Sequence, residues 1–239
     1  MKLALVSGGS RGLGLALCQA LEADGWTVVA FSRTTAHPRD VALDLSAPSA
    51  AAATLARVLE PLAAKQPSEL LAIGNAATLT PIGAPEGLEP DAIAEHLATN
   101  VAGGIVFIRG VLRAFADTAG PRTLVNISSG AATRPIRGWS LYCASKAAME
   151  RFVEVVAAEQ ADRADGFRLL NISPGVVDTG MQATIRAADP ADFPDRAHFR
   201  SLKDQGALRD PATVARAILR IVAGRPAGGS RIEVADHLG

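Results

Sequence analysis

Short apolar runs alternate along the chain with longer segments of helical periodicity. The runs are rich in leucine, valine and isoleucine and are bounded by glycine or polar residues. Continuous runs of this length are typical of strands buried on both faces of a parallel sheet. They cover residues 3–8, 26–32, 71–76, 123–128 and 167–173. Strands alternating with helices predict βαβ units and an α/β fold with one doubly wound sheet.

Apolar residues recur at intervals of three and four in residues 13–21 and again in residues 152–159, which predicts two of the helices. Local signals mark the ends of a third. Asp210 precedes Pro211, so it serves as a cap before a proline in the first turn, and Gly224 closes that helix.

The chain is predicted to be one domain, residues 1–239. Its hydrophobic fraction is 49%, enough for a sizeable core, and no linker or internal repeat divides it. The alanine-rich segment 46–59 is predicted as a helix because alanine is the best helix former. Segment 186–209 is the longest polar stretch interrupted by proline, which indicates either a substrate loop or lid, or a surface connection.

Charge and composition argue against several classes of function. Basic and acidic residues number 24 each, so nothing favours a nucleic-acid or anionic-membrane partner. No run of about 18 apolar residues is found, and the apolar run near the amino terminus is too short for a secretory signal. We therefore expect a soluble cytoplasmic protein without a metal or a disulfide framework. Neither the cysteines nor the histidines have the spacing of metal ligands; the cysteines are Cys18 and Cys143. The histidines are interpreted as surface or loop residues: His37, His96, His198 and His237.

The first run leads into a glycine loop with the spacing G-x-x-x-G-x-G, and a helical pattern follows. Glycines let the backbone approach a pyrophosphate closely, and the helix amino terminus adds partial positive charge. A structural turn is the alternative, but the strand–loop–helix context favours dinucleotide binding. The predicted loop site comprises Gly8, Ser10, Arg11, Gly12, Leu13 and Gly14.

The end of the second run favours NADP(H) over NAD(H). An acidic residue there would bind the ribose 2′-hydroxyl of NAD, but the chain has Arg33 instead. A guanidinium can bind a 2′-phosphate bidentately, and Arg11 could do so from the other side. The alternative for Arg33 is a solvated surface side chain. Asp44 could accept a hydrogen bond from the adenine amino group, or it could be a helix amino-terminal residue.

The only tyrosine, Tyr142, lies four residues before Lys146 in a helical segment. At this spacing both side chains share one helix face, so the ammonium could lower the phenol pKa towards a working range. Ser128 and Ser129 follow the strand 123–127, at the end where open α/β sheets bind ligands.

These motifs occur in the order and spacing of the short-chain dehydrogenase/reductase family, which the chain resembles over essentially its whole length. The matching positions are Gly8, Gly12 and Gly14, Asn75-Ala76, Asn100-Val101, Ser129, Tyr142 with Lys146, and Pro174-Gly175. The resemblance implies a Rossmann-like domain with seven parallel strands. One departure stands out: Ala77 occupies the place of a glycine that usually follows Asn75-Ala76, close to the adenosine.

The resemblance also implies roles for these residues. Ser129, rather than Ser128, matches the catalytic serine, and Tyr142 the proton donor. Lys146 lowers the tyrosine pKa and binds the nicotinamide ribose, and Asn100 resembles the residue that holds a relay water. The cofactor contacts further implied are Asn75, Pro174, Gly175, Val177 and Thr179, the last near the carboxamide.

A closer resemblance is to sepiapterin reductases and the benzil-reductase-like bacterial members of the family, carried by residues 138–143 and 170–182. That subgroup reduces bulky vicinal dicarbonyl compounds with NADPH. Glu233 corresponds to the acidic residue that anchors pterins, or is a strand-edge carboxylate without a ligand. Trp139 and Met181 are candidate walls of a substrate pocket, or ordinary core or interface residues.

The predicted function is an NADPH-dependent carbonyl reductase. The alternatives are a reductase of 3-oxoacyl or sugar-like ketones and a regulatory protein that senses NADP(H) without turnover. By the same resemblance, helices around residues 100–116 and 142–160 would pack across a two-fold axis, giving a homodimer or homotetramer.

Overall fold

In the computed structural model, which describes residues 1–238, the strands form one parallel sheet of seven, and this confirms the predicted fold class. The strand order is β3-β2-β1-β4-β5-β6-β7. The first three strands are added towards one edge of the sheet and the last four towards the other, so the order of strands reverses between β1 and β4. The strands are β1 (Lys2–Ser7), β2 (Thr27–Ser32), β3 (Asp40–Ala42), β4 (Glu69–Gly74), β5 (Arg122–Ile127), β6 (Arg168–Ser173) and β7 (Arg231–Glu233).

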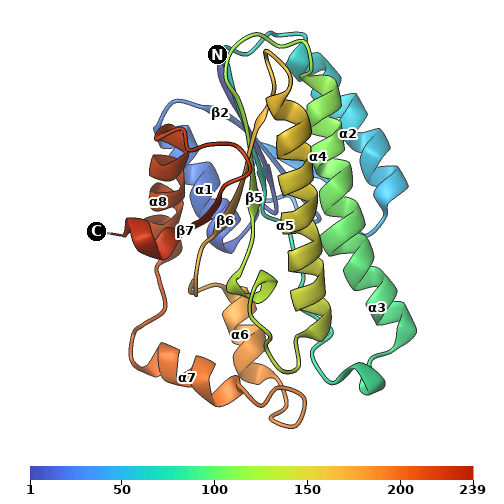
Figure 1. Cartoon of the computed structure of the whole chain (residues 1–239), viewed down its shortest axis with the longest axis vertical. Coiled ribbons are helices and arrows are strands. Elements are labelled where there is room, and N and C mark those ends of the chain that lie inside the picture. Colours follow the sequence, from blue (N-terminus) through green and yellow to red (C-terminus); the bar gives the residue numbers. More distant parts are fainter. Residues whose placement is uncertain (239) are drawn as a thin grey trace.

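Helices cover both faces of this sheet (Figure 1). One face carries α1 (Gly12–Ala23) and α8 (Pro211–Ala223), and the other carries α2 (Pro48–Ala63), α4 (Gly104–Ala114) and α5 (Ser140–Ala161). Side chains of β1 alternate between the two apolar cores: Leu3 and Leu5 pack on the α2/α4/α5 face, whereas Ala4 and Val6 pack on the α1/α8 face. A strand buried on both faces needs an apolar residue at every position, which explains the continuous runs in the sequence.

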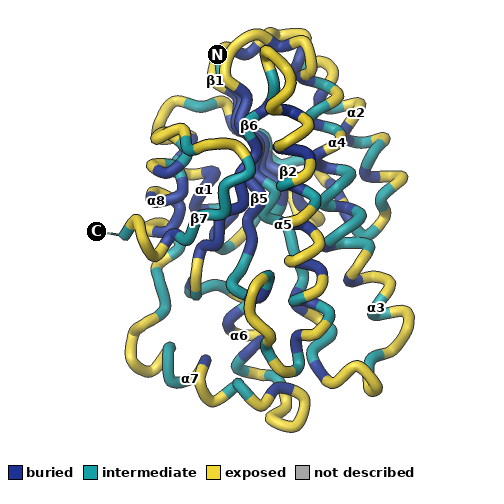
Figure 2. The backbone as a smooth tube through the Cα atoms, viewed as in Figure 1, coloured by how far each residue is buried: buried dark blue, intermediate teal, exposed yellow. Residues whose placement is uncertain are grey.

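A third apolar cluster lies beyond the sheet, where α6 (Gly180–Ala187) and α7 (Arg196–Asp204) extend the molecule in Figure 1. Phe193 and Phe199 are buried there against Trp139, and the Phe193 and Trp139 rings stack with centroids 4.9 Å apart. The segment predicted as a polar loop, 186–209, therefore contains a helix that is anchored by its few aromatic residues. In Figure 2 the residues around α7 range from exposed to buried.

The helical run Pro90–Ala114 joins α3 (Pro90–Leu97), a π-helical turn η2 (Ala98–Gly103) and α4. By length and composition it could cross a membrane, which contradicts the expectation that no such segment exists. Length and composition are weak criteria, because a core helix meets them too. Here Phe107, Ile108 and Val111 of α4 are buried in the core of the α2/α4/α5 face.

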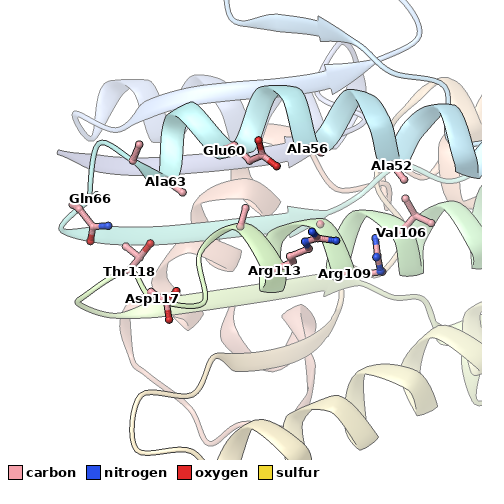
Figure 3. A pocket seen from close by; sticks show the side chains of 13 residues that line it. Ala52, Ala56, Glu60, Ala63, Gln66, Val106, Arg109, Arg113, Asp117 and Thr118 are labelled. Carbon is pink, nitrogen blue, oxygen red and sulfur yellow. The ribbon is translucent and has the colours of Figure 1, made fainter.

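A groove of about 410 Å³ runs between α2 and α4 on the outer surface, where the two helices pack together. Figure 3 shows Arg109 and Arg113 of α4 and Glu60 of α2 along it. No residue predicted for cofactor, catalysis or substrate lines this groove. The remaining short helical turns are η1 (Pro85–Gly87), η3 (Gly130–Ala132) and η4 (Val234–His237).

Candidate active site

The carboxyl ends of the central strands meet at one edge of the sheet. Ser7 pairs in register with Gly74, and Gly74 pairs with Asn126, so the loops after β1, β4 and β5 start side by side. The strand order reverses between β1 and β4, and open α/β sheets bind their ligands at the carboxyl edge beside such a reversal. The glycine loop leaves β1 here, and Asn75 leaves β4.

The loop has the glycines of a pyrophosphate site at positions where a side chain would collide with neighbouring backbone or with Asn75. Gly8 has φ of +72°, and a Cβ there would lie 2.9 Å from both the Ala76 Cα and the Asn75 Nδ2. A Cβ at Gly14 would collide with the Gly8 carbonyl. The Asn75 amide donates hydrogen bonds to the carbonyls of Ser7 at 3.2 Å and Gly8 at 3.1 Å, which fixes the loop.

The other predicted loop residues differ in exposure. Arg11 is exposed at the start of α1 and Ser10 is half-buried, whereas Leu13 points into the α1/α8 core. Only the main chain of Leu13 is therefore free to face a ligand. Gly12 lies against Thr179, since a Cβ at Gly12 would be 3.1 Å from the Thr179 methyl group.

Two groups predicted for the adenosine end lie together. Arg33 is exposed directly after β2, and it is close enough to Asp44 for its charge to affect the Asp44 carboxyl. The pKa of the Asp44 carboxyl is lowered first by the Ser46 backbone N–H, then by the Ser46 hydroxyl, and to a lesser degree by Arg33. One Asp44 oxygen accepts both Ser46 bonds, at 2.9 and 2.8 Å, so the carboxylate is oriented before any ligand arrives.

Tyr142 and Lys146 lie on the buried face of α5, one turn apart. The Lys146 ammonium lies 5.7 Å from the centre of the Tyr142 ring and donates to the Ile127 carbonyl at 2.8 Å, at the end of β5. Both side chains are buried, and the Ser129 hydroxyl lies near enough to the phenol to lower its pKa. Ser129, Tyr142 and Lys146 are thus brought together at the sheet edge.

Burial controls the ionisation of this pair. It raises the pKa of Tyr142 to about 12, and the nearby Ser129 hydroxyl lowers that pKa in part. Burial also lowers the pKa of Lys146 to about 8, while the charge of Glu150 opposes that shift. Burial of the phenol thus shifts the pKa of Tyr142 in the direction opposite to the shift expected from the ammonium, because it disfavours the phenolate.

Asn100 lies within the π-helical turn η2, inside a continuous helical run rather than at the end of a helix. Its side-chain oxygen accepts from the Thr78 N–H, and its amide nitrogen donates to the Thr78 carbonyl, each at 2.8 Å. The same nitrogen lies 2.9 Å from His96 Nε2. Both N–H bonds of the Asn100 amide therefore have protein partners, and the residue clamps the loop after β4.

His96 is the clearest residue that sequence reasoning misplaced. It was expected at the surface or in a loop, yet its exposed fraction is 1% and its ring lies edge-on to Tyr142 with centroids 6.4 Å apart. Its place four residues before Asn100 put both on one helix face, and that spacing was the signal available in the sequence.

A buried polar network lies close to Ser129 and Lys146. Ser128 donates to the Glu150 carboxylate, and the Arg231 guanidinium binds the same carboxylate at 3.0 Å. Ser128 is thereby directed away from Tyr142, whereas Ser129 is directed toward it. Sequence reasoning did not include Glu150, although it lies four residues after Lys146 on the same helix face.

The segment after β6 crosses toward the glycine loop. Pro174 is buried, and Gly175 has φ of +74°. Val177 is buried in the α1/α8 core and forms a parallel bridge with Arg209, which ties this segment to the residues before α8. Thr179 then begins α6 beside the glycine loop.

Of the three candidate substrate residues, Trp139 and Met181 belong to the apolar cluster that contains Tyr142. The Trp139 ring is buried and meets Tyr142 edge-on at 5.6 Å, while Met181 is half-buried against the same aromatic cluster. The Glu233 carboxylate forms an ion pair with Arg231 at 2.6 Å. Among residues 1–238, no group of three or more potential ligand side chains is arranged to hold a metal ion.

Comparison with known proteins is consistent with this arrangement. The family model described as short chain dehydrogenase matches residues 2–190. The benzil reductase ((S)-benzoin forming) of Bacillus subtilis (strain 168) is 33% identical over 244 aligned positions, covering all of both chains. The sepiapterin reductase of Rattus norvegicus is 31% identical, covering 91% of this chain and 90% of the relative.

Solved structures share the fold. The KRED1-Pglu enzyme superimposes with a TM-score of 0.81 at 29% identity, covering 97% of this chain and 100% of the other. A short chain dehydrogenase from Burkholderia cenocepacia J2315 in complex with NADP has a TM-score of 0.76 at 26% identity, covering 97% and 95%. A 3-oxoacyl-[acyl-carrier protein] reductase from Brucella melitensis in complex with NAD has a TM-score of 0.81 at 23% identity, covering 98% and 95%, so similar folds hold either cofactor.

Proposed function

The chain belongs to the short-chain dehydrogenase family, and from that premise we propose that it is an NADPH-dependent carbonyl reductase of bulky or aromatic vicinal dicarbonyl compounds. The observation that carries the proposal is the meeting of Ser129, Tyr142 and Lys146 beside a glycine loop at the carboxyl edge of the sheet. Full-length similarity to a benzil reductase supports the substrate class.

The reaction needs a hydrogen-bond donor and a proton donor at the carbonyl oxygen. When held at the glycine loop, NADPH would supply the hydride for the carbonyl carbon. Ser129 donates a hydrogen bond to the oxygen as negative charge develops on it, and the Tyr142 phenol gives that oxygen its proton. A phenol with a pKa of about 12 is protonated throughout the neutral range, which is the form that reduction requires. The product is an alcohol.

Lys146 has a supporting role. Its bond to the Ile127 carbonyl holds the ammonium beside the tyrosine, so its charge can stabilise the phenolate left after proton transfer. A pKa of about 8 means that this charge is mostly present at neutral pH and is lost in moderately alkaline solution.

The choice of NADP(H) rests on the two arginines near the adenosine end. Arg33 follows β2 where an NAD-specific site would have a carboxylate, and Arg11 is exposed at the start of α1. Both guanidiniums are available for a 2′-phosphate, while the oriented Asp44 carboxylate serves the adenine amino group.

The substrate side is formed by the third apolar cluster. Trp139 and Met181 give an apolar wall next to Tyr142, and residues 186–209 act as a lid whose aromatic residues dock on Trp139. The Glu233 carboxylate is paired with Arg231, so it would have to bind a pterin-like group and the Arg231 guanidinium at the same time.

A homodimer or homotetramer is part of the proposal. Most residues of the apolar run Pro90–Ala114 are not fully buried within one chain, and Leu97 is 39% exposed, as expected of a helix that also meets another copy. Light scattering after size-exclusion chromatography tests this, and a monomer across the micromolar range would refute it.

A substrate panel tests the activity. Purified protein is mixed with diketones, pterins and simple ketones, and oxidation of NADPH is followed, with NADH as the control cofactor. Aromatic diketones should give the highest kcat/KM. Tyr142→Phe should lose about 10²- to 10⁴-fold in turnover and keep NADPH binding, since it removes only the proton donor. A wild-type protein that binds NADPH but reduces none of these carbonyls would favour the cofactor-sensing alternative.

A further inference from the structure

His96 occupies a buried position between three groups of the site. Its Nδ1 lies 2.8 Å from the Thr80 carbonyl oxygen, and its Nε2 lies 2.9 Å from the Asn100 amide nitrogen and 3.2 Å from the Ser145 hydroxyl. The mechanism above assigns this imidazole no role, although its ring touches that of the proton donor.

The partners fix the protonation state of the ring. A carbonyl oxygen only accepts, so Nδ1 carries the proton that is donated to Thr80. The Asn100 amide is oriented by Thr78, whose N–H and carbonyl it binds, so its nitrogen faces His96 as a donor. Nε2 must then accept, and the ring is the neutral Nδ1–H tautomer.

A second proton on Nε2 could be donated only to the Ser145 hydroxyl oxygen, which lies 3.2 Å from both Nε2 and the Asn100 nitrogen. The Asn100 nitrogen lies 2.9 Å from Nε2, so Nε2–H and the Asn100 N–H would be two donors in contact in a buried site, both directed at that one oxygen. This repulsion favours turning the amide away, which breaks its two bonds to Thr78 and with them the connection between the loop after β4 and the turn η2.

We propose that neutral His96 is a positioning residue, which holds Asn100 and the Thr78–Thr80 segment beside Tyr142 and releases them when Nε2 is protonated. The inference rests on the proposed reductase activity and extends it. Activity should fall in acid because of His96, to which the proposed mechanism assigns no contact with cofactor or substrate.

The surrounding charges support this direction. Among residues 1–238, the titratable side chains that face the ring come from α5: Lys146, through its charge, and Tyr142, through its ring. The loop 75–84 and η2 contain no titratable residue, and Asp91 and Glu95 of α3 are exposed. Burial and the Lys146 charge lower the pKa of His96, while the Thr80 bond opposes them, so the ring is neutral at pH 7.

Neither facing group competes for the acid limit. Tyr142 stays neutral and Lys146 stays charged at every pH below about 7, because their pKa values are about 12 and about 8. Of the groups that meet at this ring, only His96 is therefore expected to change its charge on acidification in this range, and its neutral form disappears as pH falls through its lowered pKa.

The kinetic test compares pH profiles of kcat for wild type, His96→Gln and His237→Gln, the last being an exposed histidine. Wild type and His237→Gln should lose activity about tenfold per pH unit below the His96 pKa. His96→Gln can still donate and accept but cannot titrate, so its profile should be flat there, with a lower kcat and an unchanged KM for NADPH. An acid limb that persists at the same pH in His96→Gln would overturn the proposal. A wild type without turnover at any pH would instead refute the reductase.

A second measurement needs no activity and no change at His96. In a variant with His37, His198 and His237 all replaced by glutamine, His96 is the only imidazole. Nitrogen chemical shifts at pH 7 should show a protonated Nδ1 and an unprotonated Nε2. An Nε2–H tautomer or an imidazolium at pH 7 would overturn the proposal.

Discussion

The single tyrosine offers a direct optical test of how burial sets the chemistry of the site. Because Tyr142 is the only tyrosine in the chain, the phenolate absorbance of the protein reports one group. The perturbation is a rapid jump from neutral pH to pH 11. At that pH a solvent-exposed phenol with a pKa of 10 would be about nine-tenths ionised.

The expected result follows from the buried ring. With a pKa raised from 10.0 to about 12, only about one-tenth of the native molecules carry a phenolate at pH 11. This rise of the pKa corresponds to roughly 3 kcal/mol against the phenolate. The folded pKa lies above the unfolded one, so this contribution to stability is fully present below pH 10 and is lost as pH rises from 10 to 12.

Stopped-flow absorbance separates the native from the unfolded signal. The native protein should give a small immediate step and a larger, slower rise as molecules unfold, whereas protein in guanidinium should give the full signal at once. Ser129→Ala should shrink the immediate step further, because the Ser129 hydroxyl lowers the pKa, and Ser128→Ala should leave it unchanged. A native midpoint near pH 10 would refute the buried phenol.

Three further outcomes are expected. Gly14→Ala should weaken NADPH binding more than tenfold in a fluorescence titration, because its Cβ collides with the Gly8 carbonyl. Gly87→Ala, where the added Cβ meets open space, should bind NADPH as wild type does. Equal affinities of Gly14→Ala and wild type would contradict the loop assignment. Arg33→Ala should cost about 10- to 100-fold in NADPH affinity and little for NADH, and a uniform loss would contradict a 2′-phosphate role. Phe193→Ala, which empties a fully buried site stacked on Trp139, should lower the free energy of unfolding by about 3–5 kcal/mol, as measured by denaturant titration; a loss below about 1 kcal/mol would contradict that packing.

Much of the architecture could be predicted because its signals are local. The apolar run at 123–128 corresponds to β5, and the capped segment starting at Pro211 corresponds to α8. The three-residue strands β3 and β7 are too short for periodicity to reveal, and their places at the sheet edges depend on pairing with β2 and β6. The helix α7 was missed although Phe199 and Leu202 stand three residues apart, because two large apolar residues in a polar, proline-interrupted segment are too few for periodicity to reveal a helix.

The sequence by itself determined the parallel sheet, the glycine loop and the one-turn spacing of Tyr142 and Lys146, since a strand's period, a turn's glycines and a helix's pitch act over a few residues. Only the tertiary structure decided the ionisation of that pair, the burial of His96 and the partner of Glu150. Arg231 reaches Glu150 across 81 positions of the chain, and desolvation depends on everything packed around a group. Such properties belong to contacts between distant segments, which no local pattern records.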